Sequence, residues 1–371
     1  MASKSHIAVA LVSEHKLDQV SVPTKSPGLE EVLVKVQLAT YGAADGHAVD
    51  DGFYVSGYPQ IVGLVAIGKV LEVGEGVNHI KTGDLVGAYT MPGADRAIQE
   101  YVIAPACRVT KISEVGGTTP AEIATIIDNF VTAWWTIMDS FKLPTPLTWP
   151  PKDILDPTIA STPILVWGAG TASAQYIIQV LKLLGFTNII ATASPRSSAR
   201  ALSLGATHVA DYNDPKVVDQ IKSVVGSSTP IKFAVDTVST EQSMRLISQL
   251  VAAPDSRVAL LMPIKVGEAS GGHINQGGAV QLFATLPQEH NPFKEGVLPL
   301  PTYTFTWDTN PLLKDCLMVS ILPALLQAGL IKPLPVRLIN TGSLVDRVRE
   351  AAALLKNNKL NGAKAVIDFN A

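Results

Sequence analysis

Ile164-Leu165-Val166-Trp167-Gly168-Ala169-Gly170-Thr171-Ala172-Ser173 is the stretch that decides the fold. An apolar, β-prone run ends in a glycine turn and continues directly into the apolar helical pattern of residues 174–181. Gly168 permits a tight turn, and Gly170 lets the backbone come close to a pyrophosphate. The helix that follows presents free N–H groups and the positive end of its dipole to phosphate charge. This order predicts a dinucleotide site, and the alternative is an ordinary connection between a strand and a helix.

The segment after the next expected strand, residues 188–193, indicates which dinucleotide binds. A site for NAD usually has Asp or Glu here, to accept a hydrogen bond from the ribose 2′-hydroxyl. This chain has Ser194, Arg196 and Arg200 instead. A carboxylate would repel a 2′-phosphate, whereas Ser194 and Arg196 would bind it through charge-assisted hydrogen bonds. The sequence therefore favours NADPH over NADH, and the alternative is that both arginines lie on the solvated first turn of a helix.

The composition indicates a soluble protein with a large core. The chain has 371 residues, 47% of them hydrophobic and 16% charged, a length that suggests two domains or one large one. A net charge of −3 gives no broad attraction to nucleic acid or to an anionic membrane. The two cysteines, Cys107 and Cys316, make no disulfide framework and suit a reducing compartment. Without a leader pattern or an apolar stretch of membrane-spanning length, we expect a cytoplasmic protein.

The hydrophobic pattern predicts a β-rich first third and an alternating middle. Strands are expected at 31–38, 63–74 and 83–87, followed by a helix that begins at Pro120 with Thr119 as its N-cap. The middle of the chain repeats strands at 164–167, 188–193, 207–210, 232–238, 257–263 and 279–285 with helices at 172–184, 197–204, 215–225 and 240–252. Such alternation predicts an α/β fold with a parallel sheet and right-handed crossovers.

The last part of the chain is expected to begin with an irregular connection. Residues 288–301 are polar and rich in glycine and proline, and a helix follows over 312–328 that Pro323 should kink or split. A strand at 336–339, a helix at 344–356 and a strand at 363–369 complete the expected elements.

The order of these segments resembles the medium-chain dehydrogenase/reductase superfamily. Besides the glycine turn, the motifs that carry the resemblance are Glu31-Val32-Leu33-Val34-Lys35-Val36, Pro59-Gln60-Ile61-Val62-Gly63, Gly83-Asp84, Thr132-Ala133-Trp134, Leu204-Gly205-Ala206, Phe233-Ala234-Val235-Asp236 and Leu360-Asn361-Gly362-Ala363-Lys364-Ala365-Val366. The resemblance implies a GroES-like, β-rich substrate domain over 1–127 and 291–371. It also implies a Rossmann-type, doubly wound parallel sheet over 128–290.

The departures from the zinc alcohol dehydrogenases of this superfamily concern the metal. Gly42 stands at the position of their cysteine ligand, Leu64-Val65 replaces their His-Glu pair, and the third ligand position falls near Asp128 or Asn129. Zinc needs about four N, S or O ligands, and one carboxylate does not supply them. We therefore expect no metal and no oxidation of alcohols.

The zinc-free branch of the superfamily includes quinone, alkenal and enoyl reductases. The tail at 330–337 and the turn Ser194-Pro195-Arg196 are similar to fungal trans-acting enoyl reductases, which serve polyketide synthases. The resemblance implies hydride transfer from NADPH to the C=C bond of an α,β-unsaturated carbonyl. Its expected partners are a small apolar enone, enal, enoyl thioester or quinone, and a carrier protein of a polyketide synthase. The expected assembly is a monomer or a homodimer.

Other functions stay open at this stage. One alternative is an NADPH-dependent quinone or carbonyl reductase. The others are a protein that binds NADPH without turnover and a module docked to a megasynthase.

His47 is the first candidate for a catalytic donor, because its position matches a relay histidine of the zinc alcohol dehydrogenases. Tyr54 and Tyr41 are further candidates, with packing roles as the alternative, and Asp45 is expected to be a structural acid in a turn. By the resemblance, Thr132 meets the nicotinamide amide, Tyr212 lies on the adenine side, and Val238 and Met262 line the cleft at the strand ends. The expected cofactor residues are Thr132, Gly168, Gly170, Thr171, Ala172, Ser173, Ser194, Arg196, Arg200, Tyr212, Val238 and Met262.

Overall fold

The computed structural model describes residues 4–91, 96–112, 117–226, 229–267 and 280–371. The chain divides into two compact units. Unit 1 comprises residues 1–128, 147–150 and 305–371, and unit 2 comprises residues 129–146 and 151–304. Across the described ranges, no helix is long and apolar enough to cross a membrane.

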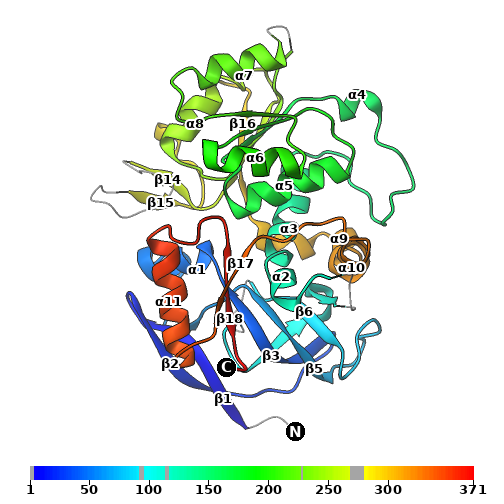
Figure 1. The fold of residues 1–371 in the computed structure, drawn as a ribbon, viewed down its shortest axis with the longest axis vertical. Helices are drawn as coiled ribbons and strands as arrows, with labels where there is room; N and C mark the ends of the chain where they lie inside the picture. Colours follow the sequence, from blue (N-terminus) through cyan, green and yellow to red (C-terminus); the bar gives the residue numbers. More distant parts are fainter. Residues whose placement is uncertain (1–3, 92–95, 113–116, 227–228, 268–279) are drawn as a thin grey trace. The chain divides into compact units, whose positions relative to one another are not determined.

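Unit 2, drawn mostly in green and yellow in Figure 1, is built on a parallel sheet. The sheet has six strands in the order β11-β10-β9-β12-β13-β16. Its strands are β9 (Ile164–Trp167), β10 (Ile189–Thr192), β11 (His208–Ala210), β12 (Phe233–Asp236), β13 (Arg257–Leu261) and β16 (Leu298–Thr302). The helices between them are α5 (Ala172–Leu183), α6 (Pro195–Leu204), α7 (Val217–Val225) and α8 (Glu241–Ser248). The strand order reverses between β9 and β12. This reversal is typical of doubly wound nucleotide-binding sheets, which the sequence pattern predicts.

The local reasons for these elements are visible in the sequence. All four residues of β9 are buried, as expected for a central strand with both faces covered. Helix α5 begins where the Thr171 hydroxyl accepts a hydrogen bond from Ala174 N at 3.2 Å. Helix α6 begins at Pro195, two residues before the expected start, because a proline is well accommodated in the first turn of a helix.

Strand β16 lies within the segment expected to be an irregular connection. It pairs in parallel with β13, and its residues Pro299 and Pro301 face Val258 and Leu260 in the register. The expected return to the first domain at residue 291 therefore comes at Phe305 instead, because β16 belongs to the sheet of unit 2. The strand expected at 279–285 is β15 (Gln281–Phe283), which pairs antiparallel with β14 (Ile264–Val266) outside the parallel sheet.

Unit 1 is the β-rich, GroES-like part. A sheet of seven strands runs in the order β17-β18-β3-β5-β6-β8, with β7 also paired to β3, and a second sheet has the order β2-β1-β4 (Figure 1). The strands are β1 (Ser5–Ser13), β2 (Lys16–Pro23), β3 (Glu31–Tyr41), β4 (Gln60–Ile61), β5 (Val65–Val73), β6 (Leu85–Tyr89), β7 (Tyr101–Pro105), β8 (Val109–Lys111), β17 (Val336–Ile339) and β18 (Lys364–Asp368). A cluster of buried, mostly aliphatic side chains joins the two sheets and includes Val9 and Leu11 of β1, Val34 of β3, Val86 of β6 and Ile367 of β18.

The remaining helices agree with the sequence in part. They are α1 (Ala43–Asp51), α2 (Pro120–Ala124), α3 (Ile127–Trp135), α4 (Pro157–Ala160), α9 (Pro311–Lys314), α10 (Leu322–Gln327) and α11 (Leu344–Lys356), with π-helical turns at Thr136–Ser140 and Leu317–Ile321. The helix expected over 312–328 is indeed divided, and Pro323 lies in the first turn of α10. Helix α1 was not expected, and it carries His47.

Candidate functional site

The glycine turn of unit 2 requires glycine at its first position. Gly168 has φ +88°, a conformation that residues with a side chain rarely adopt. A Cβ atom there would lie 2.7 Å from Val238 Cγ2 and 2.9 Å from Thr237 Oγ1. The ends of β9 and β12 therefore approach each other as closely as the backbone allows.

Hydroxyl groups hold these two strand ends together. Thr171 Oγ1 donates to Thr237 Oγ1 at 2.9 Å, and the Thr237 hydroxyl contacts the carbonyl oxygen of Trp167 at 2.8 Å. Ser173, at the third position of the motif, donates to Asn129 Oδ1 at 3.1 Å. A Cβ atom on Gly170 would lie 3.1 Å from Ser197 Oγ, which is a tight contact. The turn is thus a fixed cradle of small residues at a helix N-terminus, which suits a pyrophosphate.

A buried carboxylate orders the loop after β12, which sequence reasoning did not identify. Asp236 is fully buried and accepts hydrogen bonds from Val238 N at 3.0 Å, Ser239 N at 2.8 Å and the Ser243 hydroxyl at 2.5 Å. Burial raises the pKa of Asp236, and these donors act against that rise. On the other side of the loop, buried Lys265 donates from Nζ to the carbonyl oxygen of Val238 at 2.7 Å. The position of Val238 is therefore fixed from both sides.

The residues expected at a 2′-phosphate lie at the start of α6. Ser194 is the N-cap residue, but its side chain forms no capping hydrogen bond. Arg196 is exposed in the first turn, whereas Arg200 donates from Nε to Gln175 Oε1 of α5 at 3.1 Å. Ser194 and Arg196 are thus available to an anion, and Arg200 is held by α5.

The other predicted cofactor residues of unit 2 occupy three different places. Tyr212 follows β11 and is 41% exposed. Met262 follows β13 and precedes Pro263 in a cis peptide bond. Thr132 is buried in α3, and its carbonyl oxygen accepts a hydrogen bond from the Thr136 hydroxyl at 2.7 Å.

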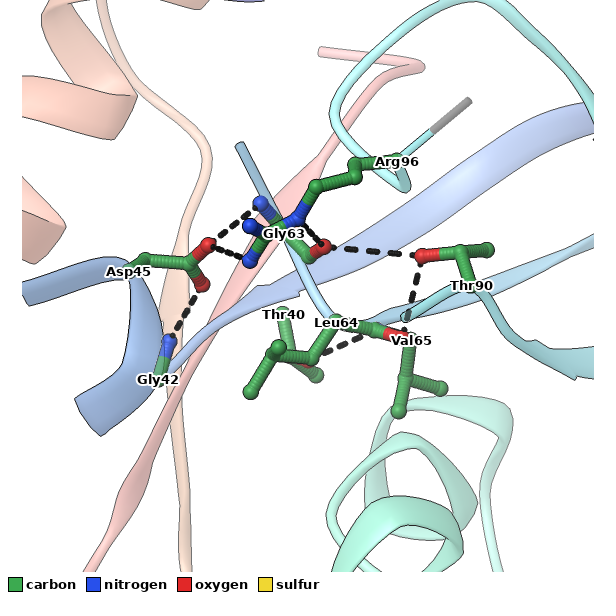
Figure 2. Close-up of polar contacts among 8 residues, drawn as sticks. All are labelled: Thr40, Gly42, Asp45, Gly63, Leu64, Val65, Thr90 and Arg96. Atoms are coloured by element: carbon green, nitrogen blue, oxygen red, sulfur yellow. Dashed lines mark hydrogen bonds and ion pairs between the residues drawn. The ribbon is translucent and has the colours of Figure 1, made fainter. Parts of the chain in front are cut away.

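The candidate metal position in unit 1 is occupied by a polar network without a metal-ligand set (Figure 2). Asp45 is fully buried; it accepts hydrogen bonds from Gly42 N at 3.0 Å and Gly63 N at 2.8 Å, and it pairs with Arg96 at 2.5 Å. Burial raises the pKa of Asp45, and the Arg96 guanidinium together with the two N–H groups opposes this rise. Asp45 is thus structural, as expected, but it lies in the first turn of α1.

The residues at the family's ligand positions do not fit zinc. Gly42 has no side chain, and a Cβ there would lie 2.6 Å from Leu64 Cδ1, so Leu64 fills the space. Asp128 is engaged in a buried ion pair with Lys364. Within the part of the chain that the structure describes, no three His, Cys, Asp or Glu side chains form a group that could hold a metal ion.

The three candidate donors of unit 1 differ in exposure. His47 lies on α1, with Nδ1 3.1 Å from Asp51 Oδ2 and a side chain that is 16% exposed. Tyr54 is 43% exposed and has φ +60°; its ring is tilted against Phe53 at a centroid distance of 4.3 Å and meets Phe305 edge to face at 5.9 Å. Tyr41 is 1% exposed, and burial raises the pKa of its hydroxyl. This geometry favours His47 and Tyr54 over Tyr41 as groups that a ligand could reach.

Comparisons with known proteins agree with this architecture. Residues 28–114 match the family model of the alcohol dehydrogenase GroES-like domain. The chain is 30% identical over 255 residues to the trans-enoyl reductase opdC of Penicillium oxalicum, covering 66% of this chain and 67% of that relative. It is 27% identical to the trans-enoyl reductase iliB of Neonectria sp., covering 93% and 91%.

Solved structures show the same fold. The crystal structure of the CurK enoyl reductase superposes with a TM-score of 0.71 at 16% identity, covering 98% of this chain and 99% of the other. The chain belongs to the medium-chain dehydrogenase/reductase family, as an enoyl-reductase-like member. It is therefore an oxidoreductase.

Proposed function

We propose that the protein reduces the C=C bond of an α,β-unsaturated carbonyl with NADPH. The observation that carries this proposal is the contrast between a complete dinucleotide cradle at Gly168 and a metal position filled by Leu64. Conjugate reduction needs the first feature and has no use for a metal, because the enolate that forms can be stabilised by hydrogen-bond donors. The trans-enoyl reductases among the relatives support the same reaction class.

The proposed reaction transfers a hydride and a proton to the acceptor. Bound NADPH supplies a hydride, which adds to the β-carbon of the acceptor, while the C=C electron pair moves to the carbonyl oxygen as an enolate. The α-carbon then takes a proton, and the products are NADP⁺ and a saturated carbonyl. His47 is the group we assign to donate to the enolate oxygen or to the ribose, with Tyr54 as the second candidate. Ser194 and Arg196 bind the 2′-phosphate.

A screen of NADPH oxidation tests the reaction class. The acceptors are an enal, an enone, a quinone and an enoyl pantetheine thioester, the last also presented on a carrier protein, with product identification by mass spectrometry. A saturated carbonyl is expected. If hydroquinone or alcohol is the only product, the reaction class is wrong.

The role of His47 is tested in the same assay. His47→Ala should lower turnover by about 10- to 1000-fold. A positioned general acid typically contributes about 100- to 10,000-fold to the rate, so the expected loss lies at or below the lower part of that range. His208→Ala is the control, since His208 is exposed on β11 of unit 2. A parent-like rate for His47→Ala removes His47 from the mechanism and leaves the reaction class intact.

The cofactor preference is tested by reversing one charge. NADPH should bind at least about tenfold tighter than NADH, and Arg196→Glu should remove this preference, a cost of about 1–3 kcal/mol for hydrogen bonds to a charged group. Lys222→Glu makes the same change of charge on an exposed position of α7 and should leave the preference as it is. Equal affinity of the parent for both cofactors, measured by fluorescence titration, contradicts the assignment.

A further inference from the structure

We propose that the buried Asp45–Arg96 pair positions the helix that carries His47, and that both residues are therefore positioning residues for the reaction. This inference builds on the proposed function and adds residues that do not themselves touch the substrate.

Helix α1 is weak on its own. It has nine residues, Ala43-Ala44-Asp45-Gly46-His47-Ala48-Val49-Asp50-Asp51, and so short a helix is marginal in water. Gly46 lowers its intrinsic stability, and the two aspartates at its C-terminal end oppose the helix dipole. Its position must therefore be set by contacts with the rest of unit 1.

The contacts at the two ends of α1 differ in burial. At the C-terminal end, Asp50 pairs with Lys356 at 2.7 Å, and the lysine side chain is 48% exposed. At the N-terminal end, the Asp45 carboxylate is fully buried and joins Gly42 N of its own first turn to Gly63 N of the loop after β4. Exposed ion pairs are screened by solvent and contribute little. Val49 also packs into the core of unit 1, but of the two ion pairs at the ends of α1 the buried one is the firmer anchor, and it lies two residues from His47.

Arg96 completes this anchor through two separate nitrogen atoms. Nη2 binds Asp45, while Nε donates to the carbonyl oxygen of Gly63 at 3.1 Å (Figure 2). The guanidinium therefore contacts both the carboxylate and the residue that this carboxylate holds. A lysine has a single point charge and cannot reproduce this forked geometry.

Arg96 is itself held in place through its backbone. Gln99 Nε2 donates to the carbonyl oxygen of Arg96 at 2.8 Å, and Gln99 Oε1 lies 2.9 Å from His6 Nε2 of β1. Gly63 has φ +106°, and a Cβ there would lie 2.8 Å from Ile98 N, so the segment after Arg96 packs directly against this loop. Three chain segments thus meet at one buried ion pair beside α1.

The experiment separates positioning from stability by removing both charges together. Asp45→Asn alone leaves Arg96 as a buried, unpaired charge, so loss of folding is a risk. The double variant Asp45→Asn/Arg96→Gln is uncharged at both positions; the new amide oxygen at position 45 can accept from one of the two backbone N–H groups, and the amide NH2 at position 96 can donate to the carbonyl oxygen of Gly63. Its thermal midpoint should lie closer to the parent's than that of either single variant. Its turnover should nevertheless stay about 10- to 100-fold below the parent's, as for a misplaced reacting group.

The controls locate the effect. Arg96→Lys keeps the positive charge beside Asp45. It should fold like the parent but show the same loss of turnover as the double variant. Asp84, in the turn before β6, resembles Asp45 in that its carboxylate binds one cationic side chain, Lys111, and one backbone N–H group, that of Lys81. Asp84→Asn should therefore keep the parental rate, because this carboxylate lies away from α1. NADPH affinity, to which Ser194 and Arg196 contribute in the proposed function, should change less than turnover does in every variant. A folded double variant with the parent's turnover overturns the inference.

Failure of the proposed function is distinguishable from failure of this inference. If the parent reduces none of the acceptors, the proposed function has failed, and the ring resonances of His47 in a ¹⁵N-histidine-labelled protein then decide the positioning role. The double variant should shift these resonances, whereas Asp84→Asn should not. Unchanged His47 resonances in a folded double variant overturn the inference.

Discussion

The glycine turn of unit 2 and the polar network beside α1 in unit 1 are both held by contacts between residues far apart in sequence, but only the turn is also a motif of consecutive residues. In the turn, Thr171 both caps its own helix and contacts Thr237, while the motif itself occupies a few consecutive residues. In the network, Asp45 and Arg96 are 51 residues apart. A local motif therefore reveals the first site, whereas only the folded chain reveals the second.

The two regions also differ in what fills them. Small side chains leave the turn open at a helix N-terminus, which is suited to an anionic ligand. In unit 1, Leu64 and Arg96 fill the space around Gly42 and Gly63 with protein atoms. The first region is thus organised to receive a group, and the second is organised to hold a helix.

The largest effect should come from the turn. Gly168→Ala forces a Cβ into a positive-φ position and against Val238, at a cost of about 2–4 kcal/mol from backbone strain and overpacking together. NADPH affinity should fall at least about 100-fold, since both strand ends must move. Gly226→Ala at the end of α7 is the matched control, because Gly226 also has a positive φ of +87° but nothing lies within 4 Å of its Cβ position. Equal losses for the two variants would show that the turn is not specified at Gly168.

An intermediate effect is expected where Gly42 meets Leu64. Gly42→Cys should lower the free energy of unfolding by about 1–3 kcal/mol, because its Cβ overlaps Leu64 Cδ1. Combining it with Leu64→Ala should cost less than the sum of the two single changes by about 1 kcal/mol. Urea denaturation measures this coupling, and Gly57→Cys, which has open space around it, is the control. Additive losses would show that Leu64 does not occupy the space beside Gly42.

The smallest effect concerns a local feature of unit 1, the start of α11. The Ser343 hydroxyl donates to the Asp346 carboxylate and lowers the pKa of that carboxyl. A lowered pKa stabilises the folded state above the unfolded value of about 3.9, and this contribution is lost as the pH falls through the folded pKa. Asp346→Asn should therefore lower Tm by about 1–2 °C at pH 6. The difference should vanish near pH 2, and a difference independent of pH would contradict the capping role.

Elements that depend on residues close together in sequence could be predicted, whereas those that depend on residues far apart in sequence could not. Strand β9, helix α5 and helix α11 were predicted closely because each has a clear apolar pattern, and each helix has its own N-cap residue. Helix α1 was missed because Gly46 and the acidic residues make a poor helix, which unit 1 stabilises from outside. The roles of Asp236 and Lys265 were missed because the two residues are far apart in sequence. Only the pairing of β12 with β13 brings both of them to the loop at Val238 and Ser239.

Strand β16 was missed because it contains two prolines, Pro299 and Pro301, and these prolines also affect the edge of the sheet. It is the last strand of the six, and Leu298 N donates inward to the carbonyl oxygen of Ser256. Alternation along a strand then turns the nitrogen atoms of positions 299 and 301 outward, where the two prolines have no hydrogen to donate. Another strand arriving at this edge finds half of the usual ladder absent. The prolines that conceal the strand in the sequence thus also oppose growth of the sheet from one molecule to the next.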